Sequence, residues 1–461
     1  MEIISEKINK ALKFSISFTL KTPLLLRSGF GGEFTDSSIE RTYDGKLHIN
    51  GYVWSSLLRR CLKRIEGGEE IAERIGKYKK DSDGNQEIHV SPLWVEPSIV
   101  DNMTYDVRTG NAIERKFGTG KTGALYNDEV VPPGIRFTLN GCFFFNSDED
   151  KEKMQGMLVS AMYPLNEGIE NIGGGWSYGL GRIECTKISI KYIDLTLPED
   201  RKNLWVFDKI KWDSTITEAE IKETPTVAKH WKKIKVKAKI TEGQLFAIHS
   251  SYPAFDPSMV YQEYPDSFVF KGYVIDADSK SIRNETIIPG RSIRQALLSV
   301  PIERKLRTIK PENICDSLAY FCQCDKCNQY RESGNKNSDS DDCICLKCKW
   351  FGSGAKGGIV SVSDAIVNNP DTEILHRIQL CEHSMQNVNL FSGEYLKAGS
   401  FDFDILVDYS REGKNNDELM NELEWLLNEM KENPDVPPGW YRMGATSACT
   451  GQITVLDWKI I

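Results

Sequence analysis

Three sequence features in the first half of this 461-residue chain return in the same order in the second half. The first is a β-like run that ends in a polar loop, near residues 13 and 235. The second is a short strand that leads into a basic helix, from Leu47 and again from Thr286. The third is a glycine-bearing segment before a closing strand, from Asn171 and from Gly439. This shared order predicts an α+β chain built from two units of related fold.

The boundary between the units is predicted at 196–232, where proline and dense charge interrupt the strand pattern. The first unit then covers 1–195 and the second covers 233–461. An insertion at 311–350, which the first unit lacks, holds most of the cysteines. One pair of matching strand and helix patterns can recur by chance, but three pairs in matching order favour duplication.

The overall charge limits the classes of partner. Lys and Arg number 58 against 66 Asp and Glu, which gives a net charge of −8. That balance argues against coating nucleic acid by bulk charge, but it allows a local basic groove. No apolar run approaches the roughly 18 residues of a membrane span, and the first residues lack the apolar core of a signal peptide. We therefore expect a folded cytoplasmic protein with no membrane partner.

The cysteines predict a metal site. Seven of the twelve lie between residues 315 and 348, and Cys324/Cys327 and Cys345/Cys348 form two CxxC pairs with 17 residues between them. This spacing is typical of a tetrahedral zinc site, and a four-sulfur shell leaves no open position for catalysis. We therefore predict that these four residues bind a structural Zn²⁺, with free core cysteines as the alternative. Three spare residues leave the choice of four open: Cys315, Cys322 and Cys343.

Two glycine-rich segments suggest nucleotide binding, but their spacing argues against it. GTGKT at 118–122 has Arg115 where a phosphate-binding loop needs its first glycine, and GGGWSYGLG at 173–181 has no GxGxxG spacing. The second loop can still bring backbone amides near a phosphate, with a tight turn that binds nothing as the alternative. The RNA contacts predicted here are Gly174, Gly175, Gly179, Gly181 and Arg182.

Basic residues gather on a predicted helix at 54–64 and after a Pro-Gly turn at 289–290. On the first helix the like charges are spaced four residues apart, which costs stability unless an anion offsets them. RNA phosphates would do so, and a solvated face is the alternative. The predicted RNA contacts are Arg59, Arg60, Lys63, Arg291 and Arg294.

Asp36 lies in a glycine-containing polar loop, SGFGGEFTDSS. A loop carboxylate can hold a divalent ion or orient a 2′-hydroxyl group, although a lone Asp is also an ordinary turn residue. The six histidines are dispersed, and the sequence offers no Ser/His/Asp arrangement.

Several segments together resemble RAMP-superfamily proteins of type III CRISPR effector complexes. Residues 345–365 resemble a family segment in which a CxxC pair leads to Phe-Gly-Ser and ends in Ser-Asp-Ala. Residues 113–137 resemble a segment with an Arg, Thr-Gly, Gly-Ala-Leu and Pro-x-Gly before a strand. Residues 287–297 resemble the family's Pro-Gly turn and helix, and 173–183 its glycine-rich loop.

The resemblance implies two tandem RRM-like (ferredoxin-like) RAMP domains in one fused, type III-D-like backbone subunit. Such a subunit lies along a CRISPR guide RNA, contacts other subunits of the complex, and interrupts the guide–target duplex with a thumb hairpin. It also implies cleavage of the target RNA with Mg²⁺ or Mn²⁺ by a loop Asp. Asp36 takes that role here, Asp266 is the closest match in the second unit, Asp256 is a weaker one, and Asp44 matches a non-catalytic turn. The segment at 113–137 adds Arg115, Lys116 and Lys121 as RNA contacts.

Two departures from the family leave alternatives open. The first unit has Asn50 where the family turn has Pro, and the second unit's counterpart of 113–137 loses the Thr-Gly and Gly-Ala core. The second site could therefore bind guide RNA without cutting. The whole chain could also be a non-catalytic guide-binding subunit, or a stand-alone endonuclease that processes guides, which the lack of a catalytic His near the glycine loop disfavours.

Overall fold

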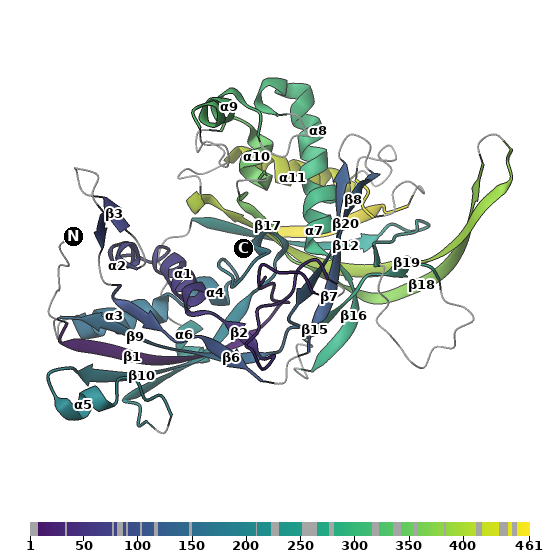
Figure 1. Ribbon diagram of the computed structural model, residues 1–461. Coiled ribbons are helices and arrows are strands. Elements are labelled where there is room, and N and C mark those ends of the chain that lie inside the picture. Colours follow the sequence, from purple (N-terminus) through teal and green to yellow (C-terminus); the bar gives the residue numbers. More distant parts are fainter. Residues whose placement is uncertain are drawn as a thin grey trace.

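The structure is a computed structural model of the chain (Figure 1). None of the helices in the part that it describes is both long enough and apolar enough to cross a membrane. The described residues are 8–32, 35–75, 78–80, 86–88, 91–101, 104–114, 119–146, 150–208, 210–222, 230–250, 265–275, 281–315, 322–334, 343–353, 357–381, 384–411, 417–432, 441–444 and 450–461.

The first unit is built on an antiparallel sheet with the strand order β11-β10-β1-β9-β5. Its strands are β1 (Lys10–Leu20), β5 (Leu93–Val95), β9 (Arg136–Phe145), β10 (Ile183–Asp194) and β11 (Ser214–Thr217). Alternate residues of β1, among them Phe14, Ile16 and Phe18, are buried, because successive side chains of a strand point to opposite faces. They pack with residues of helices α1 (Gly51–Leu62) and α3 (Asp150–Ser160), which cover that face (Figure 1).

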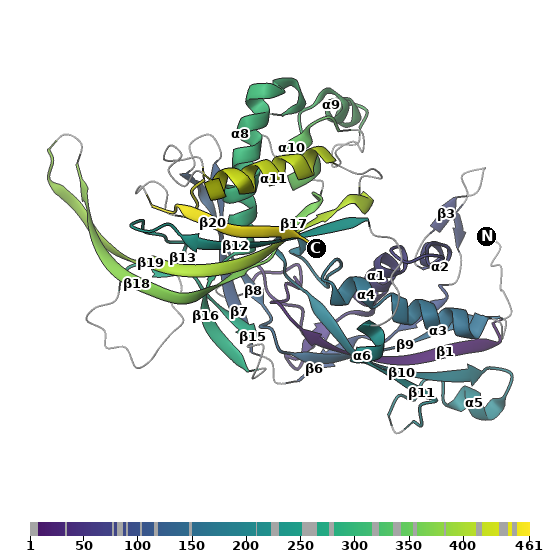
Figure 2. The ribbon, with the colours of Figure 1, turned by 180° about the vertical axis from the view of Figure 1, so that it is seen from behind.

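The second unit is built on a sheet with the order β15-β16-β18-β19-β12-β20, and β17 also pairs with β19. Its strands are β12 (Trp231–Ile240), β15 (Lys271–Ile275), β16 (Ile282–Ile288), β17 (Val360–Val362), β18 (Ala365–Leu380), β19 (Asn387–Asp408) and β20 (Ile453–Ile460). Ile234, Val236 and Ala238 of β12 are buried, whereas Lys235 and Lys237 between them are exposed. Helices α8 (Val300–Ile309) and α11 (Asp417–Glu432) cover the buried face (Figures 1 and 2).

The two sheets correspond strand by strand. The order β10-β1-β9-β5 in the first matches β20-β12-β19-β17 in the second. The pairing of β1 with β10 shifts register between Ser17 and Phe18, and the pairing of β12 with β20 shifts between Lys237 and Ala238. Ser17 and Lys237 each lie three residues before the last residue of their strand, Leu20 in β1 and Ile240 in β12. The strand order and the position of the bulge are therefore alike in the two sheets.

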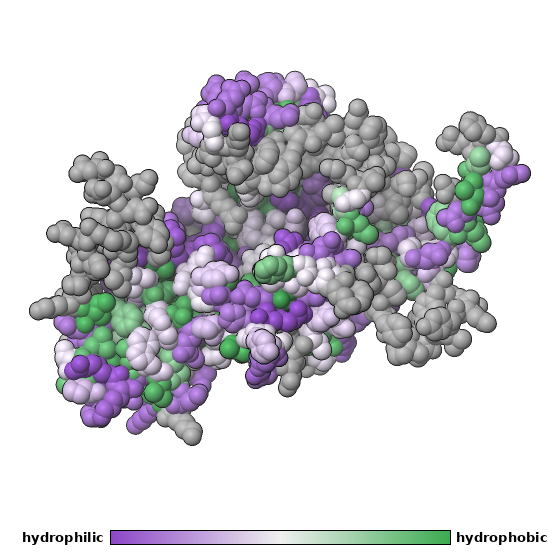
Figure 3. All heavy atoms as spheres, viewed as in Figure 1, coloured by the Kyte–Doolittle hydropathy of each residue, from purple (hydrophilic) through white to green (hydrophobic). Residues whose placement is uncertain are grey.

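Each unit carries a hairpin between its helices. In the first it is β7 (Asp106–Glu114) with β8 (Thr119–Val130), and in the second it is β18 with β19. The second hairpin forms a curved arm that extends beyond the rest of the molecule (Figures 1 and 2). Its outer part exposes apolar side chains, including Ile378 and Leu390. Figure 3 shows green patches on this arm. An exposed apolar surface of this kind is typical of a contact region.

The segment predicted as a linker contributes to the first unit. Strand β11 within it pairs with β10 and extends the first sheet, so the sheet ends later than the predicted boundary at 195. The ammonium group of Lys13 in β1 donates to the backbone carbonyls of Asn203 and Val206 and lies over the Phe207 ring. Burial lowers the pKa of this lysine. The carbonyls of the connecting segment therefore hold a cation inside the first unit.

The remaining elements are short. They are β2 (Leu47–Ile49), α2 (Glu69–Arg74), β3 (Tyr78–Lys80), β4 (Gln86–Ile88), β6 (Ser98–Val100), α4 (Tyr163–Asn166), η1 (Trp176–Tyr178), α5 (Pro198–Lys202), α6 (Glu218–Lys222), β13 (His249–Ser250), β14 (Phe268–Val269), α7 (Gly290–Ser292), η2 (Ile293–Ser299), η3 (Pro311–Asn313), α9 (Asp325–Glu332), α10 (Leu346–Phe351) and η4 (Tyr409–Arg411).

Arginines of the first unit contact aspartates of the second. Arg64, just after α1, lies 2.6 Å from Asp408 at the end of β19, and Arg108 in β7 lies 2.7 Å from Asp364. Asp408 is fully buried and Arg108 nearly so. Pairs this well removed from water hold the units in one relative position, because separating them would leave buried charges uncompensated.

Candidate functional site

The backbone of the second strand of the first hairpin holds the Asp36 loop. The backbone N–H of Asp36 donates to the carbonyl of Asn127 at 2.9 Å, and the Asn127 N–H donates to the Asp36 carboxylate at 2.7 Å. The next residue, Ser37, forms a parallel bridge with Asp128. Asp36 itself remains exposed. The hairpin thus fixes the carboxylate without removing it from solvent.

A pocket of about 320 Å³ opens beside this carboxylate. Its lining comprises Arg27, Gly29, Phe30, Asp36, Ser37, Tyr126 and Asp128. Arg27 donates from two nitrogens to Asp128, the closest contact being 2.9 Å, so its cation is held in a fixed direction. The hydrogen bond to Asp128 raises the pKa of Arg27. Phe30 is 78% exposed, and an exposed aromatic ring beside a cation suits a nucleotide base and its phosphate.

The second unit repeats this arrangement around Asp266. The N–H of Asp266 donates to the carbonyl of Ser392 at 3.0 Å, and the Ser392 N–H donates to the Asp266 carboxylate at 2.7 Å. Ser267 forms a parallel bridge with Gly393, as Ser37 does with Asp128. Asp266 is exposed as well. The structure therefore places both predicted acids at the same position of their units, whereas Asp256 lies outside the described residues.

A glutamate supports each loop, buried Glu129 in the first unit and half-buried Glu394 in the second, and the sequence interpretation missed both. The Glu129 carboxylate accepts from the Ile39 N–H at 3.0 Å and from Arg41 at 2.9 Å. In the second unit the Glu394 carboxylate accepts from the Val269 N–H at 3.2 Å. The sequence did hold a signal for them. A glutamate follows two positions after each residue that binds the loop acid, in Asn-Asp-Glu at 127–129 and in Ser-Gly-Glu at 392–394.

The two sites differ in their charged neighbours. Gly393 occupies the position that Asp128 has in the first site. His249 occupies the position of Arg27, because each lies three residues after a bridge residue that matches between the units, Phe246 in the second and Leu24 in the first. The His249 ring lies 3.0 Å from the carbonyl of Glu394, and burial lowers its pKa. Among the described residues, the second site therefore has a histidine at the position where the first site has its fixed cation.

The glycine-rich loop serves packing at two of the positions predicted to bind RNA. Gly181 has a positive φ of 69°, and a Cβ there would collide with the carbonyl of Ile172. Gly179 approaches β17 so closely that a Cβ would lie 2.8 Å from the Cα of Ser363. Other backbone fills the space beside these two glycines, and their contact with RNA stays a prediction. Gly174 is exposed and Gly175 half-buried, so their RNA contact stays a prediction.

The basic residues predicted to bind RNA separate into three groups. Arg60 is held by Glu170 at 2.8 Å, and the buried Arg294 donates to the carbonyls of Phe351 and Val360. Both residues therefore have protein partners, and their contact with RNA stays a prediction. Arg182 and Arg291 lie between the units, 3.9 Å from Asp404 and 2.6 Å from the Tyr126 hydroxyl respectively. Arg59 in α1 and Lys63 just after it also stay predictions; Arg115 and Lys116, and the side chain of Lys121, lie outside the described residues.

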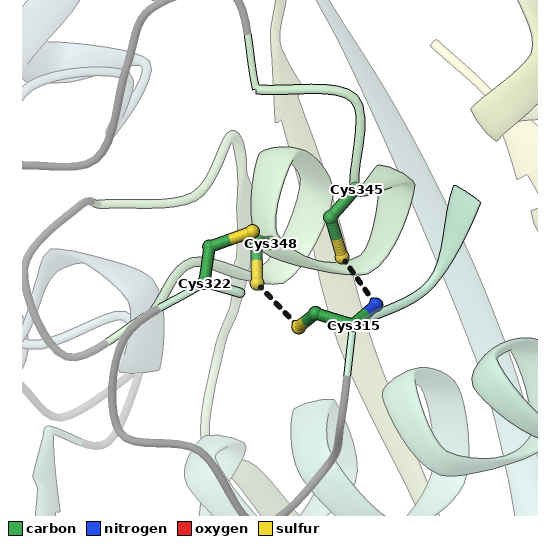
Figure 4. A group of neighbouring side chains, drawn as sticks. All are labelled: Cys315, Cys322, Cys345 and Cys348. Carbon is green, nitrogen blue, oxygen red and sulfur yellow. Dashed lines mark hydrogen bonds between the residues drawn. The ribbon is translucent and has the colours of Figure 1, made fainter. Parts of the chain in front are cut away.

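The seven clustered cysteines are all buried, and they form two groups of four. The first is Cys315, Cys322, Cys345 and Cys348, whose side chains converge in Figure 4. The second is Cys322, Cys324, Cys327 and Cys343. Within each group the sulfur atoms lie within 4.8 Å of one another, so either group could hold a metal ion such as zinc. The two predicted CxxC pairs fall in different groups, Cys345 and Cys348 in the first and Cys324 and Cys327 in the second.

Comparison with known protein families concerns the first unit. Residues 17–184 match the RAMP superfamily. This segment begins in β1 and ends in β10, so it includes the Asp36 loop, the first hairpin and the glycine-rich loop. The RAMP superfamily includes CRISPR-associated proteins, and the match supports a CRISPR-related role in RNA binding. A search of curated proteins finds no match for the chain.

Proposed function

We propose that this RAMP protein is a backbone subunit of a type III CRISPR effector complex and binds the guide RNA along two RRM-like (ferredoxin-like) units. It cleaves the complementary target RNA beside Asp36 and Asp266. The observation that carries the proposal is the repeated site, an exposed carboxylate fixed by the strand at the base of a hairpin in each unit. The hairpins β7–β8 and β18–β19 are then the thumbs that interrupt the guide–target duplex.

The chemistry requires little from the protein. The 2′-hydroxyl of RNA supplies the nucleophile once it is aligned with the scissile phosphate. Mg²⁺ or Mn²⁺, when bound, would offset the developing charge on that phosphate. The Asp36 site fits such an ion, because its hard oxygen donor is exposed and Mg²⁺ usually takes one or two carboxylates together with phosphate oxygens and water. The Asn127 N–H holds the carboxylate, and the fixed Arg27 cation offers a partner for phosphate.

RNA recovered with the full chain tests the proposed class. When the chain is purified with its neighbouring subunits from cells that carry a CRISPR array, we expect the bound RNA to be phased guides derived from the repeats. Recovery of unrelated transcripts would contradict guide binding. Cleavage of a repeat hairpin by the isolated chain without metal would favour the guide-processing endonuclease instead.

A second prediction concerns the second unit. Because Asp266 is held as Asp36 is, we expect Asp266→Ala in the assembled complex to remove one target-cleavage position and to leave guide binding unchanged. Asp402→Ala, which alters an exposed acid on β19, is the matched control and should cut normally. Product bands that are the same in both variants would mean that the second unit binds RNA without cutting it.

A further inference from the structure

The two cysteine groups share a single member, Cys322. One metal ion can fill only one group of four. The other group then has three cysteines left, and its fourth member, Cys322, is already a ligand of the first ion. Because a thiolate sulfur has more than one lone pair, it can bind two ions at once. We propose that the seven cysteines hold two zinc ions bridged by the Cys322 thiolate.

The sulfur positions suit metal ligands and exclude disulfides. With Zn–S bonds of about 2.3 Å in a tetrahedron, neighbouring sulfur atoms lie roughly 3.8 Å apart. The Sγ–Sγ distances are 3.4 Å for Cys315–Cys348, 3.2 Å for Cys322–Cys343 and 3.5 Å for Cys324–Cys343. A disulfide would need about 2.05 Å, and these cysteines are free. Seven buried thiols at these distances therefore match one continuous thiolate cluster.

Cations lie beside the cluster. Seven thiolates and two divalent ions leave three net negative charges, which burial would make costly without partners. Arg307 donates to the carbonyl of Cys315 and also pairs with Glu303, and Arg331 donates to the carbonyl of Cys322. Hydrogen bonds to ligand residues are the outer support that metal–thiolate sites usually have.

The two ions would connect the insertion to the core of the second unit. Cys348 lies in α10, and the following residues Trp350 and Phe351 are buried in that core. Cys324 and Cys327 lie at the start of α9. With its own ion, each helix is fixed to the shared Cys322, so metal binding and folding of the insertion should be coupled. This inference does not depend on the proposed cleavage activity.

Metal stoichiometry tests the proposal. Native mass spectrometry of the full chain, together with elemental analysis, should give two zinc ions for each chain. Cys327→Ser and Cys348→Ser each alter one group and should retain one ion, whereas Cys381→Ser, a half-buried cysteine outside the cluster, should retain both. A single zinc ion in the unaltered chain would overturn the proposal.

The bridge has its own signature. After replacement of zinc by NMR-active cadmium, a shared sulfur should couple the two metal nuclei, so each of the two resonances is split by the other. Cys322→Ser should remove the splitting and lower the metal content below two ions. Two unsplit resonances in the unaltered chain would show separate sites and contradict the bridge. The spectrum of the unaltered chain is decisive even where a cysteine variant fails to fold.

Discussion

Replacing Asp36 by alanine is expected to lower target cleavage at one position by on the order of 100- to 1000-fold, while guide and target RNA remain bound. A loss of this size is typical when stabilisation of the developing charge is removed from a site, and Asp36 would provide it by holding the metal ion. Binding should persist because the loop is held mainly by backbone contacts, including the Asp36 N–H to Asn127 and the Ile39 N–H to Glu129. The measurement is a time course of product bands in the assembled complex.

Two variants sharpen this test. Asp36→Asn keeps an oxygen that can accept from the Asn127 N–H but removes the negative charge, so it should cut as poorly as the alanine variant. Asp44→Ala removes an exposed acid from a nearby turn, where Asp44 contacts Thr42 and Lys46, and should leave cleavage unchanged. Normal cutting by Asp36→Asn would contradict a role for the charge. Loss of RNA binding together with cleavage would show that Asp36 is structural.

Replacing Arg64 by methionine is expected to destabilise the protein by about 3–5 kcal/mol, the usual cost of removing one partner from a buried ion pair. Arg64 donates to Asp408 and to Glu170, each at 2.6 Å, and both carboxylates are buried. Burial alone would lower the pKa of Arg64, but its hydrogen bonds and the charges of these two carboxylates outweigh that effect and raise it. Without the guanidinium, both buried carboxylates would lose this cation, although Glu170 would still contact Arg60.

Denaturant unfolding measures this effect. Lys63→Met, a change at the adjacent exposed residue just after α1, is the matched control and should shift the midpoint little. Adding Asp408→Asn to Arg64→Met removes the charge of one of the two carboxylates that contacted Arg64, and it should recover part of the loss. Equal midpoints for Arg64→Met and Lys63→Met would contradict the role of Arg64 between the units.

The repeat could be read along the chain because its signals are local. Alternating burial in β1 and β12, and the short distance from strand to helix, depend on residues near one another in sequence. The loop acids could also be found, since Asp36 and Asp266 each precede a serine and a strand-like segment. The support that Glu129 and Glu394 give to the loops could not be found in the sequence. These contacts form only when the hairpin folds back beside the loop.

By itself, the sequence determined the α+β repeat, the two candidate acids and the existence of a cysteine cluster. Only the tertiary structure decided which cysteines lie together and which basic residues have protein partners. Arg64 and Asp408 are 344 residues apart, and Cys315 and Cys348 are 33 apart, so no local pattern relates them. The physical reason is that charge pairing and metal ligation act through space, whereas strand and helix periodicity acts along the chain.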